Sequence, residues 1–368
     1  MTKHQNKIEK LIAELCPNGV EVKSIGEICQ INRGRVMSKD YLKDNAGEYP
    51  VYSSQTADDG IFGRINTYDY DGEYLTWTTD GAYAGSIFYR NGKFSITNVC
   101  GLLKAKSDDV NMKFLSYILA TVSKKYVSAG MGNPKIMSNV MEKIKIPLPP
   151  LAIQEEIVKI LNSFTELEAE LEAELEARKK QYEHYRKDLM LSNNDGVWKT
   201  LGDIYDFQYG EGNTIPNTGG KYPVYGGNRL AGQHDQYNSE DAPVIGHIGA
   251  YAGIVNWVNG KHFVTYNGVI CKIKTNINPR YGYYLLLLQD FRSQAHSGSQ
   301  PFISYDILKK ATVQIPDLSH QNNIVTMLDK FEALVNDISI GLPAELSARR
   351  LQYEYYRGKL LTFNEYAK

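Results

Sequence analysis

Apolar residues recur at intervals of three and four from Leu151 to Leu191, a stretch that contains no glycine or proline. This spacing places the apolar side chains on one stripe of a helix. About forty residues rising 1.5 Å each make a rod of roughly 60 Å. A matching stripe runs from His320 to Leu361 and contains Gly341-Leu342-Pro343, where we expect the helix to break or kink. The pattern therefore predicts two long helices.

Both stripes are too long and too narrow to be buried against one globular domain each. We therefore expect the two helices to pack against each other as an antiparallel coiled coil. The residues assigned to this contact are Ile157, Phe164, Leu171, Tyr182, Tyr185, Ile324, Phe331, Ile338, Tyr353 and Tyr356. The alternative is that each helix lies along its own domain, because an apolar stripe alone does not identify its partner.

The chain also repeats itself, with a period of roughly 170 residues. Matching segments occur in the same order in both halves, and their spacing drifts by only a few residues. They include Tyr49–Tyr52 with Tyr222–Tyr225, Gly81–Gly85 with Gly249–Gly253, and Ala177–Arg186 with Ala348–Arg357. The sequence therefore contains two copies of one unit.

The first part of each copy is rich in Gly, Tyr, Val, Ile and Asn and has short alternating runs. Turn signals are frequent, among them Asp59-Gly60, Asp71-Gly72, Asn91-Gly92 and Asn259-Gly260. This composition is typical of a twisted, mainly β domain with hairpins and one or two helices. The predicted fold class is α+β, with two mainly β domains joined by two long helices in an antiparallel coiled coil with pseudo-twofold internal symmetry.

Proline-marked boundaries and the two stripes define the expected domains. They are an N-terminal helical segment (1–18), a first β domain (19–150), a central spacer helix (151–192), a second β domain (193–318), and a distal spacer helix with a tail (319–368).

Composition excludes several classes of protein. A net charge of −1 argues against a polycation that coats nucleic acid, so any DNA binding must use local charge or a partner's charge. The four cysteines are far apart and form no C-x-x-C pair, which predicts neither a zinc site nor a disulfide framework. With no membrane span and no signal peptide, we expect a cytoplasmic protein.

The sequence also lacks the motifs of an independent enzyme. We find no phosphate-binding loop of the G-x-x-x-x-G-K-[ST] type, no nuclease cluster of carboxylates and lysine, and no paired histidines for a metal. We therefore expect no catalytic residues, no metal and no cofactor in this chain.

Two motifs give the chain a recognisable resemblance. Ile146–Ile157 reads Ile-Pro-Leu-Pro-Pro-Leu-x-x-Gln-x-x-Ile, and the long helix that follows ends in Arg178–Arg186; both are echoed at Ile315–Ile324 and Arg349–Arg357. With the repeated β domains, this arrangement resembles the specificity (S) subunits of type I restriction–modification systems over essentially the whole chain. The distal copy departs from it only in Ile-Pro-Asp-Leu, which lacks the second proline.

The resemblance implies two target-recognition domains, each reading one half of a split, asymmetric DNA sequence. It further implies two methyltransferase (M) subunits as partners and, in the full complex, restriction (R) subunits. The complex would then carry DNA adenine methylation and ATP-dependent cleavage. Two unlike readers on a common frame would also suit unlike half-sites, spaced by about one helical turn of DNA or a multiple.

Polar residues on loops of the β domains are the candidates for contact with DNA, because loops held by a rigid sheet carry most contacts. They are Ser53, Ser54, Gln55, Thr79, Tyr83, Asn133 and Lys135 in the first domain, and Asn228, Arg229, His247, Tyr251 and Gln300 in the second. Asn and Gln can pair with adenine and Arg with guanine, whereas Lys and Tyr more often hold phosphate.

Each candidate also has a purely structural interpretation. Asn, Gln and Ser beside turns commonly satisfy backbone groups, and a histidine such as His247 is often part of a core or a turn. Tyr83 and Tyr251 lie between glycines, which suits either close approach to DNA or a tight hairpin. At the level of the whole chain, the rival functions are a coiled-coil adaptor whose β domains bind protein and a degenerate enzyme with a site between its domains.

Overall fold

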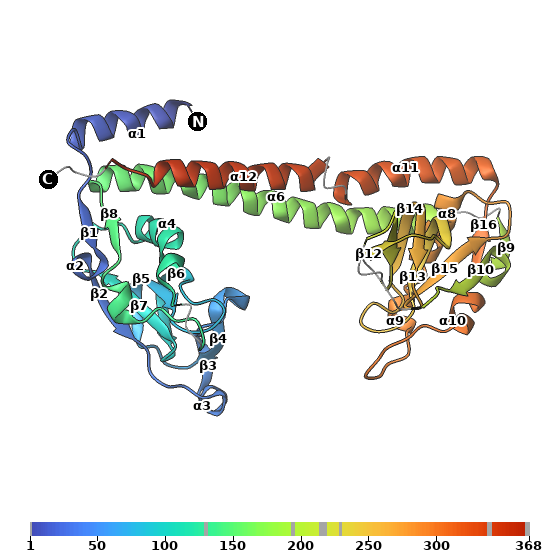
Figure 1. Ribbon diagram of the computed structural model, residues 1–368, viewed down its shortest axis with the longest axis horizontal. Helices are drawn as coiled ribbons and strands as arrows, with labels where there is room; N and C mark the ends of the chain where they lie inside the picture. Colours follow the sequence, from blue (N-terminus) through green and yellow to red (C-terminus); the bar gives the residue numbers. More distant parts are fainter. Residues whose placement is uncertain are drawn as a thin grey trace. The chain divides into compact units, whose positions relative to one another are not determined.

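The chain folds into two compact units that share the long helix α6 (Leu151–Leu191). The computed structural model describes residues 2–128, 132–192, 196–212, 219–227, 230–336 and 341–364 (Figure 1). Unit 1 comprises Met1–Glu170 and Ser347–Lys368, and unit 2 comprises Leu171–Leu346. Each copy of the sequence repeat therefore supplies the β domain of one unit.

Unit 1 contains a six-stranded sheet, a two-stranded sheet and the helices that pack on them. Its elements are α1 (Thr2–Leu15), β1 (Val22–Ser24), α2 (Ile25–Ile28), β2 (Cys29–Arg33), α3 (Lys39–Asp44), β3 (Ala46–Tyr52), η1 (Ala57–Gly60), β4 (Ile61–Ile65), β5 (Tyr70–Thr78), β6 (Ile87–Ile96), β7 (Cys100–Ala105), α4 (Met112–Val122), η2 (Ser123–Tyr126), α5 (Ser138–Met141), β8 (Lys145–Pro147) and the first part of α6.

Unit 2 repeats this order after the second part of α6. Its elements are β9 (Val197–Thr200), α7 (Leu201–Ile204), β10 (Tyr205–Tyr209), β11 (Tyr222–Tyr225), β12 (Leu230–His234), β13 (Ser239–Gly246), β14 (Val255–Val264), β15 (Gly268–Ile273), α8 (Pro279–Leu287), α9 (Phe291–Gln294), α10 (Tyr305–Lys310), β16 (Thr312–Ile315) and α11 (Leu318–Asn336). Helix α12 (Gly341–Leu360) begins in unit 2 and continues into unit 1. Gly341, at the start of α12, has a positive φ of 71°, which is not helical, so the helix is broken there as the sequence predicted.

The two large sheets have the same strand order. It is β2-β7-β5-β6-β3-β4 in unit 1 and β10-β15-β13-β14-β11-β12 in unit 2. In both, one pair is parallel (β3 with β6, β11 with β14) and the other neighbouring strands are antiparallel. The small sheets β1-β8 and β9-β16 are equivalent as well. This agreement confirms the internal repeat.

Three of the four predicted turns are wrong. Gly72 and Gly92 face each other inside the β5–β6 pair, and Gly260 lies inside β14. All three glycines have positive φ angles, which lets long paired strands bend where the sequence pattern suggested that they end. Only Asp59-Gly60 belongs to a turn, the 3₁₀ turn η1.

A serine or threonine at the N-cap begins the first helix of each β domain. The Ser24 hydroxyl caps α2 by accepting from the Glu27 amide, while the Glu27 carboxylate accepts from the Ser24 amide. Thr200 and Asp203 form the same capping box on α7. Each box satisfies donors that the first turn of a helix leaves unpaired.

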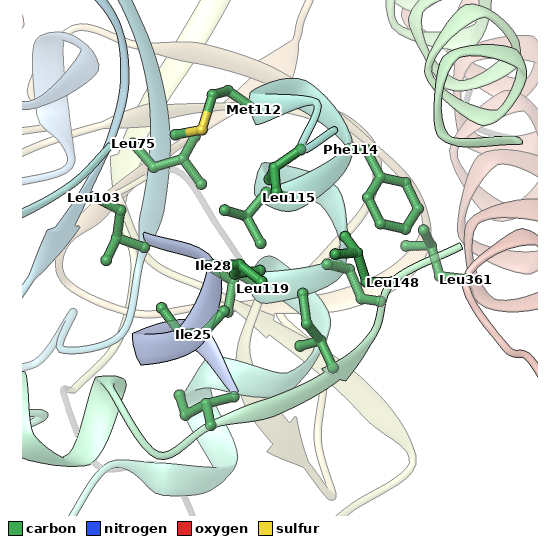
Figure 2. Packing of buried hydrophobic residues seen from close by; sticks show 14 of the residues in the cluster. Ile25, Ile28, Leu75, Leu103, Met112, Phe114, Leu115, Leu119, Leu148 and Leu361 are labelled. Atoms are coloured by element: carbon green, nitrogen blue, oxygen red, sulfur yellow. The ribbon is translucent and has the colours of Figure 1, made fainter. Parts of the chain in front are cut away.

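The core of unit 1 lies between its large sheet and the helices. Figure 2 shows α2 residues Ile25 and Ile28 packed against Leu115 and Leu119 of α4. Leu75 of β5 and Leu103 of β7 complete this cluster, while Leu148 and Leu361 join it from beside the long helices. Fully burying one such leucine stabilises the fold by about 1.5–3 kcal/mol. Unit 2 has an equivalent core.

A buried glutamine explains the Leu-x-x-Gln motif in both copies. Gln154 accepts a hydrogen bond from the Asn111 amide at 2.9 Å and donates to the carbonyl oxygens of Asp109 and Pro149 at 2.8 and 2.7 Å. Gln321 likewise accepts from the Asn278 amide at 2.8 Å. Each side chain is fully or almost fully buried. The glutamine therefore fastens the start of α6 to the start of α4 in unit 1, and the start of α11 to the start of α8 in unit 2.

In unit 1, α6 pairs with α12 in opposite chain directions. Phe164 stacks on Tyr356 with ring centroids 5.7 Å apart and meets Tyr353 edge-on at 6.2 Å. One turn further along α6, Glu168 pairs with Arg350 at 2.6 Å, earlier in α12. Ile157 is fully buried in the core of the same unit. Helix α6 therefore packs against both its β domain and a second helix, so the two arrangements considered above coexist.

In unit 2, the second part of α6 packs against α11. Tyr185 stacks on Phe331 with ring centroids 5.9 Å apart, and the side chains of Tyr182 and Ile324 are buried. Leu171 is half-buried. Ile338, also assigned to the helix contact, lies outside the described residues.

Candidate nucleic-acid interface

Four chain segments meet at one end of the large sheet in unit 1. The Thr79 amide donates to the Val99 carbonyl at 3.2 Å, and the Ile136 amide donates to the Thr79 carbonyl at 2.9 Å. Gly34, directly after β2, donates to the Cys100 carbonyl at 3.4 Å. The loops after β2 and β5, the β6–β7 connection and the segment before α5 therefore form one surface.

A group of charged residues and one threonine lies on this surface; we call Arg33, Thr79, Asp80 and Lys135 the charged cluster. Arg33 Nη2 donates to Thr79 Oγ1 at 3.0 Å and to the Asn98 carbonyl at 2.5 Å, and lies 3.9 Å from Asp80 Oδ2. The Thr79 hydroxyl donates to Asp80 at 2.6 Å, and Lys135 Nζ lies 3.6 Å from the other Asp80 oxygen. One carboxylate thus holds two cations in place.

Unit 2 builds the same backbone arrangement. The His247 amide donates to the Asn267 carbonyl at 2.8 Å, and the Ile303 amide donates to the His247 carbonyl at 2.9 Å. Gly210, directly after β10, donates to the Gly268 carbonyl at 2.9 Å. These bonds match those of Thr79, Ile136 and Gly34 one for one. Positions in the two units can therefore be compared directly.

In the same region unit 2 carries rings; we call Tyr209, His247, Tyr266 and Tyr305 the aromatic cluster. Of these, Tyr209 and His247 stand at the positions of Arg33 and Thr79. Tyr209 stacks on His247 at 4.2 Å and on Tyr305 at 4.1 Å between ring centroids, and Tyr266 lies 5.6 Å away. Burial raises the pKa of the Tyr209 and Tyr305 hydroxyls, so both stay neutral at physiological pH. Tyr209 occupies the place of Arg33.

The other charged residues of the charged cluster are also replaced by apolar residues in unit 2. Ile248 replaces Asp80, and Phe302, which stacks on His296 with ring centroids 4.5 Å apart, replaces Lys135. Tyr266 and Phe302 are 44% and 41% exposed, so the second surface presents apolar rings to solvent. One backbone frame therefore offers charge in unit 1 and aromatic surface in unit 2.

The structure brings most of the predicted residues of unit 1 to this end of the sheet. Lys135 and Asn133 are exposed beside Asp80, and Tyr83 is 57% exposed at the tip of the loop after β5. Thr79 is fully buried, and its hydroxyl orients Arg33 and Asp80. Because Thr79 is buried, it positions other residues of this surface and does not reach the solvent itself.

Ser53, Ser54 and Gln55 follow β3 and are half-buried. The Ser53 hydroxyl accepts from the Thr97 hydroxyl at 2.9 Å, and the Gln55 amide donates to the Ile61 carbonyl. Ser53 therefore touches the β6–β7 connection, whereas the Gln55 bond is internal to its own loop.

In unit 2 the predicted residues fall on matching positions. Tyr251 is 42% exposed and matches Tyr83, and the exposed Gln300 matches Asn133. His247 matches Thr79; it is 6% exposed, and its Nδ1 lies 3.1 Å from the Tyr266 carbonyl oxygen. Its burial fits the interpretation as a core histidine. Asn228 and Arg229 lie outside the described residues.

Sequence reasoning missed the central member of the charged cluster. Arg33 ends β2, far in sequence from Thr79 and Lys135, and nothing in its neighbourhood marks it as different from any surface arginine. A signal was nevertheless available: aligning the copies sets Arg33-Gly34 against Tyr209-Gly210, a charged residue against an aromatic one before a shared glycine.

Two further features were also missed. Arg90 is 3% exposed, lies 3.6 Å from the Tyr52 ring centroid, and holds the Asp59 carboxylate at 2.5 Å, which anchors the loop after β3. The exposed Lys124 and Lys125 lie in η2, where Ser123 donates to the Gly85 carbonyl at 2.7 Å. Lysines beside a reading loop suit phosphate contacts.

Comparison with known proteins gives the chain its family. A model of the type I restriction modification DNA specificity domain matches it twice, over residues 17–177 and 195–348. The chain belongs to this family. A Mycoplasma pneumoniae protein named as a type I specificity subunit is 32% identical over 366 residues, covering 94% of this chain and 98% of the relative.

Solved structures agree on the fold of this specificity subunit. The S subunit of a Mycoplasma genitalium type I restriction–modification system matches with a TM-score of 0.56 at 17% identity, covering 93% of this chain and 96% of that one. A chain from a study of type I complex assembly matches with a TM-score of 0.61 at 15% identity, covering 94% and 97%. Two mainly β domains with a long helix between them are thus the fold of the family.

The described residues contain no group of three or more His, Cys, Asp or Glu side chains placed to hold a metal ion. Across the same described ranges, no helix is long and apolar enough to cross a membrane.

Proposed function

We propose that each unit of this specificity subunit reads one half of a bipartite, asymmetric DNA sequence, with its charged or aromatic cluster near the centre of the contact. The observation that carries the proposal is the exchange of side chains on a common backbone frame. The same hydrogen bonds position Arg33, Asp80 and Lys135 in one unit and Tyr209, Ile248 and Phe302 in the other. Readers built alike but lined differently suit unlike half-sites.

The exposed residues predicted from sequence form the outer part of each proposed contact. In unit 1 these are Tyr83, Asn133 and Lys135, and in unit 2 they are Tyr251 and Gln300. Lys124 and Lys125 would hold phosphate, which adds affinity without sequence selection. We also retain the five predicted domains, from 1–18 to 319–368, as the functional division of the chain.

The same proposal gives the subunit no catalytic role and no cofactor of its own. Two methyltransferase subunits would supply adenine methylation and restriction subunits ATP-dependent cleavage, in the cytoplasm. A cavity of about 430 Å³ in unit 1, lined by Ile12, Ile160, Phe164 and Leu360 among others, supports a protein partner on the helices. With a net charge of −1, the chain would bind DNA through locally arranged charge or with the support of a partner that adds positive charge.

The test is methylation mapping with the subunit assembled with its methyltransferase partners. We expect one motif with two unlike specified halves separated by an unspecified gap. The double variant Lys124→Gln, Lys125→Gln should weaken binding of all sequences alike and reduce the salt dependence of binding, with the motif unchanged.

Two outcomes would overturn the proposal. Absence of sequence-selective retardation of DNA by the assembled complex would favour the protein-binding adaptor. Methylation or cleavage by the purified chain without partners would favour an enzyme with a site of its own.

A further inference from the structure

We infer that Arg33 is a specificity-determining residue that reads guanine in the half-site bound by unit 1, an inference that rests on the proposed function. Nothing in the family match assigns this role to a residue. The inference comes from the position of Arg33 at the centre of the charged cluster and from its replacement by Tyr209 in the other copy.

The first step is the orientation of the guanidinium. Nη2 is held by the Thr79 hydroxyl at 3.0 Å and the Asn98 carbonyl at 2.5 Å, with Asp80 3.9 Å away. Among the described residues, the acceptor of Nη1 is the Met137 sulfur at 3.8 Å, which is a weak acceptor. The Arg33 side chain is 30% exposed. One edge of the guanidinium is thus fixed by protein while the rest remains accessible at the surface.

The second step is the chemistry of the bound edge. Guanine presents two acceptors, O6 and N7, in the major groove. Nη1 of Arg33, whose described acceptor is only a weak one, keeps its N–H groups for donation to guanine. A side chain already held in one geometry loses little rotamer freedom on binding. Lys135, 51% exposed and 3.6 Å from Asp80, adds a second donor beside Arg33. The cluster therefore suits a base pair rich in acceptors.

The third step is the contrast with unit 2. Tyr209 is stacked between His247 and Tyr305, and Ile248 stands where Asp80 stands in unit 1. The described residues of the aromatic cluster include no guanidinium at the position of Arg33. Their exposed neighbours Tyr266 and Phe302 offer apolar contact, which suits a thymine methyl group. The contact that Arg33 makes with guanine therefore belongs to the half-site bound by unit 1.

Arg33 also joins three loops, so the experiment must separate reading from folding. The wild-type target is first defined by methylation mapping with the assembled complex. Arg33→Lys, which keeps the charge but loses the planar guanidinium, and Arg33→Gln are then assayed on DNAs carrying all four bases at each specified position. The matched control is Arg35→Gln, because Arg35 is an exposed arginine bonded to Asp69 and Tyr41 outside the cluster.

We expect both Arg33 variants to lose preference at a single G·C pair in one half-site, by roughly 5- to 150-fold. The other half-site stays as selective as in the wild type, and Arg35→Gln keeps the wild-type motif. Thermal unfolding of each variant checks that unit 1 remains folded. If Arg33→Gln does not fold stably, the more conservative variant Arg33→Lys provides the test of base preference.

Three results would overturn the inference. They are an unchanged motif in both Arg33 variants, loss of preference at an A·T pair, and equal weakening of both half-sites in a folded variant. Each leaves the proposed function standing, because that fails only when the wild-type complex itself shows no bipartite selectivity.

Discussion

Single side-chain exchanges give the two copies different attachments between β domain and helix. In unit 1 the Tyr117 hydroxyl donates to the neutral Asn162 at 2.7 Å. At the equivalent place in unit 2, Tyr284 donates to Asp329 and Glu332, and Arg280 pairs with both carboxylates at 2.7 and 2.5 Å. The guanidinium also lies 5.1 Å from the centroid of Trp257. An ionic network thus replaces one neutral hydrogen bond.

Arg280→Met should destabilise unit 2, because it leaves two carboxylates side by side without their cation. We expect a loss of about 2 kcal/mol in the free energy of unfolding, the scale of a hydrogen bond to a charged group. Urea unfolding followed by tryptophan fluorescence measures it, since unit 1 contains Trp77 and unit 2 contains Trp198 and Trp257. The control is Lys113→Met at the matching position of unit 1, where the loss should stay below about 1 kcal/mol. Equal losses in both variants would contradict this account.

The two capping boxes should titrate at low pH. Hydrogen bonds from the Ser24 hydroxyl and then the Ser24 amide lower the pKa of Glu27 below its ordinary 4.5. The Thr200 hydroxyl and amide lower the pKa of Asp203 below 3.8 in the same way. Because the folded pKa values are depressed, the contribution of each box is present above the unfolded pKa and is lost as pH falls through the folded pKa.

Carboxyl-detected NMR titration of the full chain measures both values. Ser24→Ala should return the pKa of Glu27 towards 4.5 and leave that of Asp203 unchanged, so each box is the other's control. A Glu27 carboxyl that titrates at or above 4.5 in the wild-type chain would be incompatible with the capping geometry.

At the scale of elements, each unit depends on a close backbone crossing at the end of its first long strand. A Cβ on Gly34 would overlap the carbonyl oxygens of Ile96 and Thr97, and a Cβ on Gly210 would overlap those of Val264 and Thr265. Neither glycine has a positive φ, so the need is for space. The crossing brings the loop after the first strand onto the surface that carries the charged or aromatic cluster.

Gly34→Ala should therefore separate β2 from the β6–β7 connection and disturb Arg33. We expect a loss of roughly 1–3 kcal/mol of stability, as for other overpacked sites, together with weaker sequence preference in one half-site. Gly298→Ala is the control, because a Cβ there meets nothing within 4 Å and φ is not positive. Chemical unfolding measures the stability, and methylation mapping measures the sequence preference. If Gly34→Ala matched the wild type in both, the close backbone crossing at Gly34 would be refuted.

At the scale of the whole molecule, one helix belongs to both units. Helix α6 runs without interruption from Leu151 to Leu191, and residues 167–177 repeat Leu-Glu-Ala-Glu in tandem. Most carboxylates of this tract are exposed, whereas Glu168 pairs with Arg350 of α12. A change in the length of α6 within this tract alters the connection between the two units and leaves the residues of both β domains unchanged.

Inserting one further Leu-Glu-Ala-Glu copy after Glu174 would lengthen α6 by about 6 Å and rotate it by about 40°. If the helix sets the spacing of the readers, the unspecified gap in the DNA target should widen by one or two base pairs, with both half-sites unchanged. Methylation of DNAs with varied gaps tests this. The control replaces Glu172-Ala173 by Ala-Glu at constant length, and a changed half-site sequence in the insertion variant would count against the model.

The sequence by itself determined the features that depend on neighbours along the chain. Local spacing predicted the two long helices, the break at Gly341 and the mainly β character of both domains. The similarity of segments in the two halves of the sequence predicted the repeat. Local spacing failed at Asn91-Gly92, where a glycine signals either a turn or a bend inside a paired strand, and only the partner strand distinguishes them.

Only the tertiary structure decided which side chains share a surface. The strand order carries residues 33, 80, 98 and 135 to one end of a sheet, although about a hundred residues separate the first from the last. Burial then separates supporting residues such as Thr79 and His247 from exposed ones such as Lys135 and Tyr251. Long-range pairing and burial depend on the whole chain, so no local pattern records them.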